Sequence, residues 1–342
     1  VAITPGLQAP TLTLSNGGTA TYLTGHNSND LLFRYVVSQD DSDSDQLAVV
    51  AFNTHDSTVE DGAGNAIDIT LLAGSNDLAA SHTIVVDATA PVLQGVRLVE
   101  TVDPLTNTDT DAPIDGYYGM GKTVAFEVDF DSDVLVDTTH GSPILTLSNG
   151  ELATYVSGSG SSILRFEYTV SEAHVNTRAL EVIGLAEQGA LITDAASNDA
   201  IVDIDADQLN YTTLVIDTKR PTGTLAVSAT EAVTSISTPV TLTLRFDEAM
   251  DVSTLSVDDL ILSVSAQTEV GDGQGGSGDA SLFDASSMIV PDSLTQISPT
   301  EFTVELLTPD LVRGELIIDV AQDAIRDQAG NPMTAALQTQ YA

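Results

Sequence analysis

The chain has 342 residues, and its 50 acidic against 10 basic side chains give a formal net charge of −40, which opposes binding to nucleic acid or to an anionic membrane surface. It contains no cysteine, which excludes disulfides and thiolate metal sites, and no apolar run approaches the roughly 20 residues of a membrane-spanning helix. Hydrophobic residues nevertheless make up 42% of the chain, so we expect packed cores in two or three domains rather than a disordered acidic tail.

An internal repeat organises the chain. The octapeptide Pro-Thr-Leu-Thr-Leu-Ser-Asn-Gly at 10–17 returns 133 residues later, at 143–150, with one change. The segments 31–38 and 164–171 are related at the same distance. Self-similarity at a fixed spacing is the signature of serial structural units.

Two further motifs recur at the ends of these units. The phrase Val-x-Asp-x-x-x-Pro occurs at 85–91, with Val in the second position, and its relative Val-Ile-Asp-Thr-Lys-Arg-Pro occurs at 215–221. An Asp-x-x-x-Asn pentapeptide occurs at 61–65, 194–198 and 327–331, each copy 133 residues after the one before. The spacing indicates that each unit carries one such pentapeptide near its end.

We therefore divide the chain into unit one (1–90), unit two (91–220) and unit three (221–342). Near its start, unit three aligns with unit two at a distance of only 116 residues, so it carries an insertion further on. The Gly-rich segment 271–279 has the composition of a flexible loop and is where we place that insertion.

The predicted secondary structure is all β. In chain order, residues 11–14, 123–130, 241–246 and 301–306 alternate apolar and polar side chains with a period of two, as half-buried strands do. Ser-Asn-Gly and Asp/Gly clusters between such segments favour turns. Short strands with frequent turns predict antiparallel β-sandwiches, and the repeat predicts that they follow one another in tandem, as beads on a string.

Unit one lacks a counterpart of the strand at 123–130, because Val1 aligns with Val134. Two interpretations stay open. In one, the chain is an excerpt of a longer repetitive protein. In the other, a strand from a second copy completes unit one, and this head-to-tail exchange builds a filament. Under the second hypothesis we expect the donor strand near the C-terminal residues 337–342.

Four motifs carry a resemblance to a known family: Leu-Thr-Leu-Ser-Asn-Gly followed by Ala-Thr-Tyr, Leu-x-Phe-x-Tyr-x-Val, Asp-x-Ala-Gly-Asn, and Val-x-Asp-x-x-x-Pro. Together they resemble the bacterial immunoglobulin-like domains of large repetitive surface proteins, the biofilm adhesins and RTX-type adhesin stalks. The resemblance implies immunoglobulin-like β-sandwiches in an extracellular, non-enzymatic adhesion protein that contacts its own neighbouring domains or other copies. Unit two departs from the pattern, because Ser197 replaces the glycine of Ala-Gly-Asn.

Calcium is the cofactor that these motifs suggest, because Ca²⁺ takes six to eight oxygen ligands from carboxylates, amides, carbonyls and water. The Asp-x-x-x-Asn loops, the linker aspartates and the acidic ends of two strands supply such oxygens near the expected junctions. In related adhesins such clusters bind calcium and stiffen the linkers. The alternative is that these residues only cap turns. The candidate ligands are Asp61, Asn65, Asp87, Asp129, Asp131, Asp133, Asp194, Asn198, Asp217, Asp247, Glu248, Asp251, Asp327 and Asn331.

A binding module is the alternative function, in which loops at the domain ends recognise a surface glycan or a protein. Tyr117 and Tyr118 are the one adjacent aromatic pair, and we assign them to the core or to an interface, with a sugar contact as the alternative. An enzyme is not expected, since the five histidines lack metal-ligand spacing and neither a Gly-x-Ser-x-Gly elbow nor a lysine-bearing phosphate loop occurs.

Overall fold

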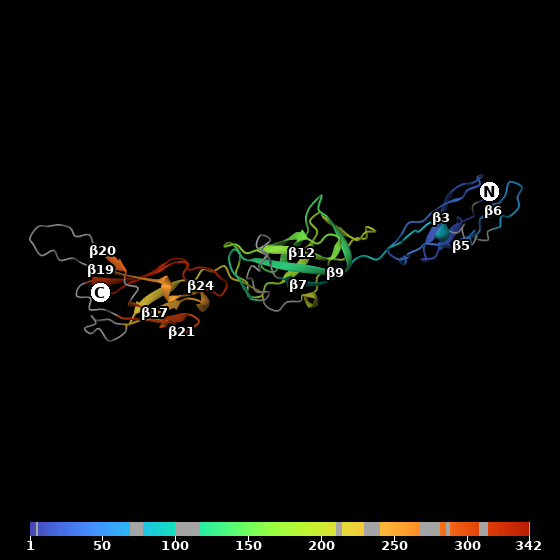
Figure 1. The fold of residues 1–342 in the computed structure, drawn as a ribbon. Coiled ribbons are helices and arrows are strands. Elements are labelled where there is room, and N and C mark those ends of the chain that lie inside the picture. Colours follow the sequence, from blue (N-terminus) through green and yellow to red (C-terminus); the bar gives the residue numbers. More distant parts are fainter. Residues whose placement is uncertain are drawn as a thin grey trace, which may run out of the picture.

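The computed structural model describes residues 1–4, 6–68, 78–99, 116–209, 214–228, 240–266, 281–284, 288–307 and 314–341. The predicted insertion at 271–279 lies outside these residues. Strands dominate the described chain and gather in three groups in Figure 1, blue for unit one, green for most of unit two, and orange to red for most of unit three. The prediction of an all-β fold is confirmed. Within the described residues, the helices are α1 (Leu78–Ser81) and three 3-10 turns, η1 (Ala206–Gln208), η2 (Val252–Thr254) and η3 (Val257–Asp259).

None of the helices in the described part of the chain has the length and apolar character that crossing a bilayer requires.

Unit one contains a four-stranded antiparallel sheet in the order β4-β3-β2-β5 and a separate antiparallel pair of β1 with β6. Its core is small: Leu14, Leu47 and Val86 are buried, with Tyr35 and Val49 packed against them. The strands are β1 (Ala2–Thr4), β2 (Thr11–Leu14), β3 (Thr19–Thr24), β4 (Leu32–Arg34), β5 (Val49–Asn53) and β6 (Thr58–Glu60).

Unit two is built around the long strand β9, which joins two sets of strands. Its first part pairs with both β12 and β7, and its last three residues, 135–137, pair with β14. On the far side of β12 the sheet continues through β11 and β10 to β13, and β8 pairs in parallel with β15. The strands are β7 (Leu93–Val99), β8 (Gly116–Tyr118), β9 (Thr123–Asp137), β10 (Ile144–Leu147), β11 (Leu152–Ser157), β12 (Ser161–Thr169), β13 (Val182–Ala186), β14 (Leu191–Thr193) and β15 (Leu214–Ile216).

Unit three has two four-stranded antiparallel sheets, β16-β17-β22-β21 and β20-β19-β23-β25, and a short pair of β18 with β24. The strands are β16 (Gly223–Val227), β17 (Val240–Phe246), β18 (Met250–Asp251), β19 (Leu260–Ala266), β20 (Ser281–Asp284), β21 (Thr295–Ser298), β22 (Glu301–Leu306), β23 (Gly314–Val320), β24 (Arg326–Asp327) and β25 (Leu337–Tyr341).

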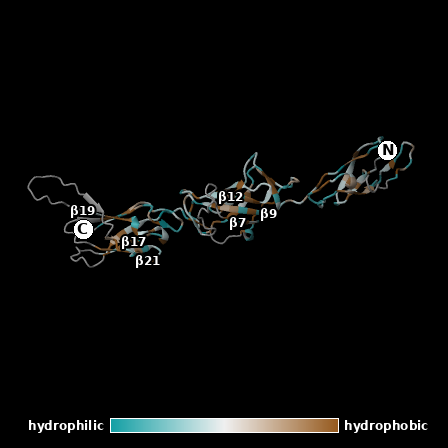
Figure 2. Ribbon diagram, in the orientation of Figure 1, coloured by the Kyte–Doolittle hydropathy of each residue, from teal (hydrophilic) through white to brown (hydrophobic). Residues whose placement is uncertain are grey.

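The apolar side chains that recur at every second position of the strands also form the cores. Along β17, Val240, Leu242, Leu244 and Phe246 are buried while the residues between them face outward. Leu242, Leu244 and Phe246 pack in one cluster with residues of β22, β19 and β23, so the two sheets of unit three enclose a shared core. Figure 2 shows hydrophobic residues in brown along the strands of units two and three.

All four strands that the alternation predicts are present. One of them differs in length, because β9 continues to Asp137 where the sequence predicts an end at Phe130. The pairing of β9 with β12 shifts register between Asp129 and Val134, so a bulge carries the strand past its polar residues.

The outer edge of β4 has no partner strand among the described residues, whereas β12, its counterpart in unit two, pairs with β9. Phe166 and Tyr168 of unit two are 0% and 2% exposed, but their counterparts Phe33 and Tyr35 are only half-buried. The residues near which we expect a donor strand, 337–341, form β25, which pairs with β23 in its own sheet.

Candidate metal centre at the junction of units two and three

The three Asp-x-x-x-Asn pentapeptides fold into the same loop. In the third copy, Asp327 Oδ1 accepts the backbone N–H groups of Ala329 (2.9 Å) and Asn331 (2.8 Å), and its Oδ2 accepts Asn331 Nδ2 (2.9 Å). Asp61 and Asp194 make the corresponding three bonds at 2.8–2.9 Å. Ser197 does not change the loop: its φ of 73° lies in the left-handed region, as do the glycines that it replaces.

In two of the loops, the asparagine also holds the linker that enters its unit. Asn331 Nδ2 donates to the carbonyl oxygen of Asp217 at 2.8 Å, and Asn198 Nδ2 donates to that of Asp87 at 3.1 Å. Among the described residues, the side-chain amide of Asn65 donates only to Asp61. The repeat thus places one linker contact at each of the two junctions.

The second junction has an additional contact between units two and three. Asn331 Oδ1 accepts the backbone N–H of Met120, which follows β8 of unit two, at 2.8 Å. Gly119 makes this approach possible, because a Cβ there would lie 2.3 Å from the carbonyl oxygen of Ala329. Asn331 is only 1% exposed, and both ends of its amide are hydrogen-bonded.

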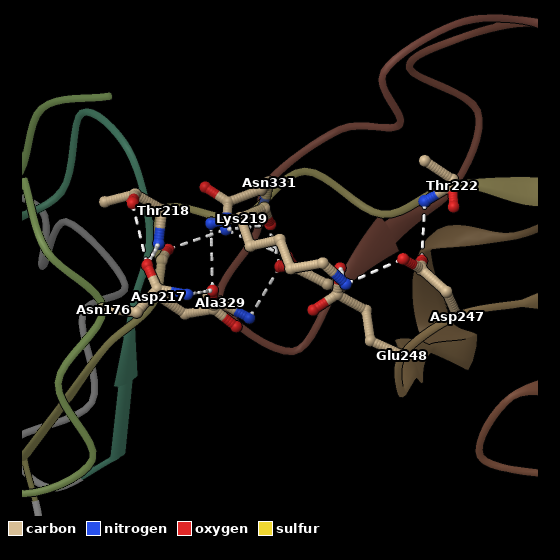
Figure 3. A network of polar contacts seen from close by, with 10 residues as sticks. Asn176, Asp217, Thr218, Lys219, Thr222, Asp247, Glu248, Ala329 and Asn331 are labelled. Carbon is tan, nitrogen blue, oxygen red and sulfur yellow. Dashed lines mark hydrogen bonds and ion pairs between the residues drawn. The ribbon is translucent and has the colours of Figure 1, made fainter. Parts of the chain in front are cut away.

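Three carboxylates meet beside this contact, and Figure 3 labels two of them, Asp217 and Glu248. One oxygen each from Asp217, Glu248 and Asp327 lies within 4.8 Å of the other two, and no other three His, Asp or Glu side chains are this close in the described chain. Asp217 follows β15, Glu248 follows β17, and Asp327 ends β24. The linker and two loops of unit three therefore supply one carboxylate each.

The linker side chain Lys219 borders the cluster. Its Nζ lies 2.7 Å from Asp247 Oδ2 and 3.2 Å from Glu248 Oε1, so it ties the linker to unit three (Figure 3). Burial opposes ionisation of Asp247, but hydrogen bonds from Lys219 and Thr222 outweigh that effect and lower the pKa of Asp247.

Two carboxyls of the cluster, those of Asp327 and Glu248, are harder to ionise than ordinary carboxyls. Burial raises the pKa of Asp327, and the charge of Asp217 adds to the effect. Burial also raises the pKa of Glu248, despite Lys219, and the charges of Asp217 and Asp327 raise it further. A cation placed among the three carboxylates would relieve both the burial penalty and their mutual repulsion.

Asn176 orients Asp217. Its Nδ2 donates to Asp217 Oδ1 at 2.8 Å, and its Oδ1 accepts the backbone N–H of Thr218 at 2.7 Å. The counterpart in unit one is Asp43, which accepts the N–H of Ala88 at 2.7 Å but has no amide hydrogen to donate. Among the described residues, a side chain of the preceding unit donates to the linker carboxylate at the second junction, to Asp217, and not at the first.

The first junction keeps the linker contact but not the cluster. Asp131 accepts the N–H of Val92 at 2.8 Å, as Asp247 accepts that of Thr222 at 2.7 Å. Ser132 stands where unit three has Glu248, and Thr89 stands where the second linker has Lys219. At the first junction, the carboxylates of Asp87, Asp131 and Asp194 consequently do not form a cluster like that of Asp217, Glu248 and Asp327.

The remaining candidate ligands lie elsewhere. Asp129 is engaged by Arg97, at 2.6 Å to each carboxylate oxygen. Asp133 is exposed, and Asp251 caps η2 by accepting the N–H of Ser253 at 2.9 Å. Asp61 and Asn65 are exposed in their loop.

Sequence reasoning missed Lys219, Asn176 and Gly119 as parts of the site. One signal was available for Lys219, since it is one of two lysines in an acid-rich chain and lies in a linker motif. Asn176 and Gly119 had no such signal, because their roles depend on contacts that the fold creates.

No protein-family model matches the chain, and no curated protein sequence matches it. The resemblance to bacterial immunoglobulin-like repeats therefore depends on the motifs in the sequence.

Proposed function

We propose that the chain is a non-enzymatic structural segment of an extracellular bacterial adhesion protein, in which immunoglobulin-like units are joined by linkers that calcium stiffens. The observation that carries this proposal is the environment of Asn331, which joins unit three to the linker at Asp217 and to unit two at Met120. Contacts that recur between successive units and fix their linkers suit a spacer better than a catalyst.

The adjoining carboxylates support calcium as the stiffening ion. Asp217 belongs to the linker, whereas Glu248 and Asp327 belong to unit three, so one ion would hold linker and unit together. Carboxylates are hard oxygen ligands, and extracellular modules need a Kd of only about 10⁻⁴–10⁻³ M. An ion bound by the folded chain alone also stabilises the fold.

Calorimetric titration of the full chain with calcium tests this assignment. We expect the wild-type chain to bind one ion with a Kd of about 10⁻⁴–10⁻³ M, and the variant carrying Asp217→Asn and Glu248→Gln to bind at least about tenfold more weakly. Asp87→Asn is the matched control in the first linker, where Ser132 replaces the third carboxylate, and should bind like the wild type.

The pH dependence of the same titration has a defined sign. Because the folded chain raises the pKa values of Glu248 and Asp327, both carboxyls take up protons at a higher pH than ordinary acids do. Calcium requires the ionised forms, so affinity should fall, and proton release should rise, as the pH drops toward those raised values. Absence of millimolar binding, or equal binding by the double variant, would contradict the calcium assignment.

The β4 edge favours a second candidate, a filament segment in which unit one accepts a strand from another copy. Unit two shows the geometry such a strand would take, since β9 pairs with β12 through eight residue positions and covers Phe166 and Tyr168. The half-buried Phe33 and Tyr35 of unit one would gain the same cover. Strand addition to an open sheet edge is a general mode of recognition.

A further inference from the structure

A cavity of about 690 Å³ lies at the end of unit two, beside the second linker. Its volume falls within the range of small-molecule sites, about 300–1,000 Å³. The walls come from the β8–β15 ribbon, from the loop that precedes β13, from the linker and from unit three. The lining residues are Tyr117, Asn176, Thr177, Arg178, Val215, Ile216, Asp217, Lys219 and Glu248.

Tyr117 gives this cavity an aromatic wall. β8 pairs with β15 so that Tyr117 lies opposite Val215 and Tyr118 lies opposite Ile216. Tyr118 and Ile216 are 2% and 1% exposed, which places Tyr117 and Val215 on the outer face of the ribbon. Tyr117 is 44% exposed, more than any other Phe or Tyr whose side-chain burial the structure describes, and among the described residues its hydroxyl has no hydrogen-bond partner. Nearly half of this side chain is therefore accessible to a ligand.

Arg178 adds a positive charge that forms no ion pair within the described part of the chain. It is exposed, and no carboxylate of the described residues pairs with it, although the chain carries 50 acids against 10 basic residues. The other cation of the cavity, Lys219, is paired with Asp247 and Glu248. The position of Arg178 in the repeat corresponds to Asp45 of unit one, so the fold itself does not require an arginine there.

The chemistry of the lining selects one class of ligand. An arginine pairs with a carboxylate through two parallel hydrogen bonds, and an exposed tyrosine ring packs against the flat apolar face of another ring. The carboxylates of Asp217 and Glu248 accept hydrogen bonds from hydroxyl groups. A phosphate would bring up to two charges toward those acids, whereas a sugar carboxylate brings one and is accompanied by hydroxyl donors.

We propose that this cavity binds an acidic saccharide, with the sugar ring on Tyr117, its carboxylate on Arg178 and its hydroxyls toward Asp217 and Glu248. The site is a recognition function beyond the spacer role, and it does not require calcium. It makes the second junction a point of contact with a carboxylated polysaccharide.

The test is calorimetric titration of the full chain in excess chelator, with trigalacturonic acid as the probe and the neutral galactotriose as its matched counterpart. The wild-type chain should bind the acidic trisaccharide at least about tenfold more tightly than the neutral one. Arg178→Gln should abolish that preference, and Tyr117→Ala should weaken binding of the acidic probe at least about tenfold. Arg34→Gln, an exposed arginine of unit one, should leave binding unchanged.

Three results would overturn the proposal: no binding of the acidic trisaccharide up to about 10 mM, equal affinity for both sugars, or unchanged binding by Arg178→Gln. If Tyr117→Ala fails to fold, the exposed Arg178→Gln variant still decides the question. Because the titration contains chelator, failure here leaves the calcium assignment standing, and failure of calcium binding leaves this site standing.

Discussion

At the scale of single residues, asparagines at the same position of the repeated loop make different contacts in different units. Asn331 is buried and satisfies a linker carbonyl and an N–H of unit two, whereas Asn65 sits in an identical loop and is exposed. An unpaired buried polar group costs about 1–3 kcal/mol, while an exposed group finds water instead. The burial, and not the motif, decides how much each asparagine contributes.

We therefore predict unequal effects for two matched substitutions. Asn331→Ala should destabilise unit three and its linker by about 2 kcal/mol, because it leaves the Met120 N–H and the Asp217 carbonyl unpaired. Asn65→Ala should cost no more than about 0.5 kcal/mol. Hydrogen exchange read separately on peptides of each unit is the suitable measurement, since a chain of several units need not unfold in two states. Equal changes in exchange for the two variants would contradict the structural role of Asn331.

The sequence could predict the Asp-x-x-x-Asn loops but not what they hold. The motif is local, and its aspartate closes a turn by accepting the backbone N–H groups of the residues two and four positions later. The partners of Asn331 lie 114 and 211 residues away in the chain, so only the fold reveals them. For the same reason the sequence suggested fourteen ligands with equal weight, and the structure brings three of them together.

At the scale of elements, the alternation of apolar and polar residues was sufficient to locate strands but not to predict where each strand ends. β17 and β22 follow the predicted limits closely. A bend at Asp247 and Glu248 follows β17, and a turn at Pro299 and Thr300 precedes β22. β9 runs on through Asp131, Ser132 and Asp133, where three consecutive exposed residues break the alternation. After the bulge, β9 pairs with β12 once more, at Val134, and then pairs with β14 from Leu135 on. A local sequence pattern does not encode that exchange of partners.

The open edge of β4 leads to a prediction about strand binding. A synthetic peptide with the sequence of residues 117–133, which includes the strand that covers β12 in unit two, should bind antiparallel to β4 and cover Phe33 and Tyr35. We expect slower hydrogen exchange at Leu32–Arg34 and a higher melting temperature of the full chain. A scrambled peptide of the same composition is the control. If both peptides leave exchange at β4 unchanged, the filament hypothesis loses its acceptor site.

At the scale of the whole molecule, charge is the dominant property. Fifty acids against ten bases repel one another, and monovalent salt screens all of them alike. A coordinated divalent ion acts differently, because it binds at one place and only to the arrangement that brings its ligands together. Calcium and salt can therefore be separated by holding the ionic strength constant.

Small-angle X-ray scattering of the full chain, in about 5 mM calcium and in excess chelator at equal ionic strength, tests the central claim most directly. Calcium should increase the maximum dimension of the wild-type chain and narrow the range of overall lengths that it adopts. The variant with Asp217→Asn and Glu248→Gln should scatter alike in both conditions. An unchanged wild-type profile, or an equal response in the double variant, would contradict a spacer stiffened by calcium at the junction of units two and three.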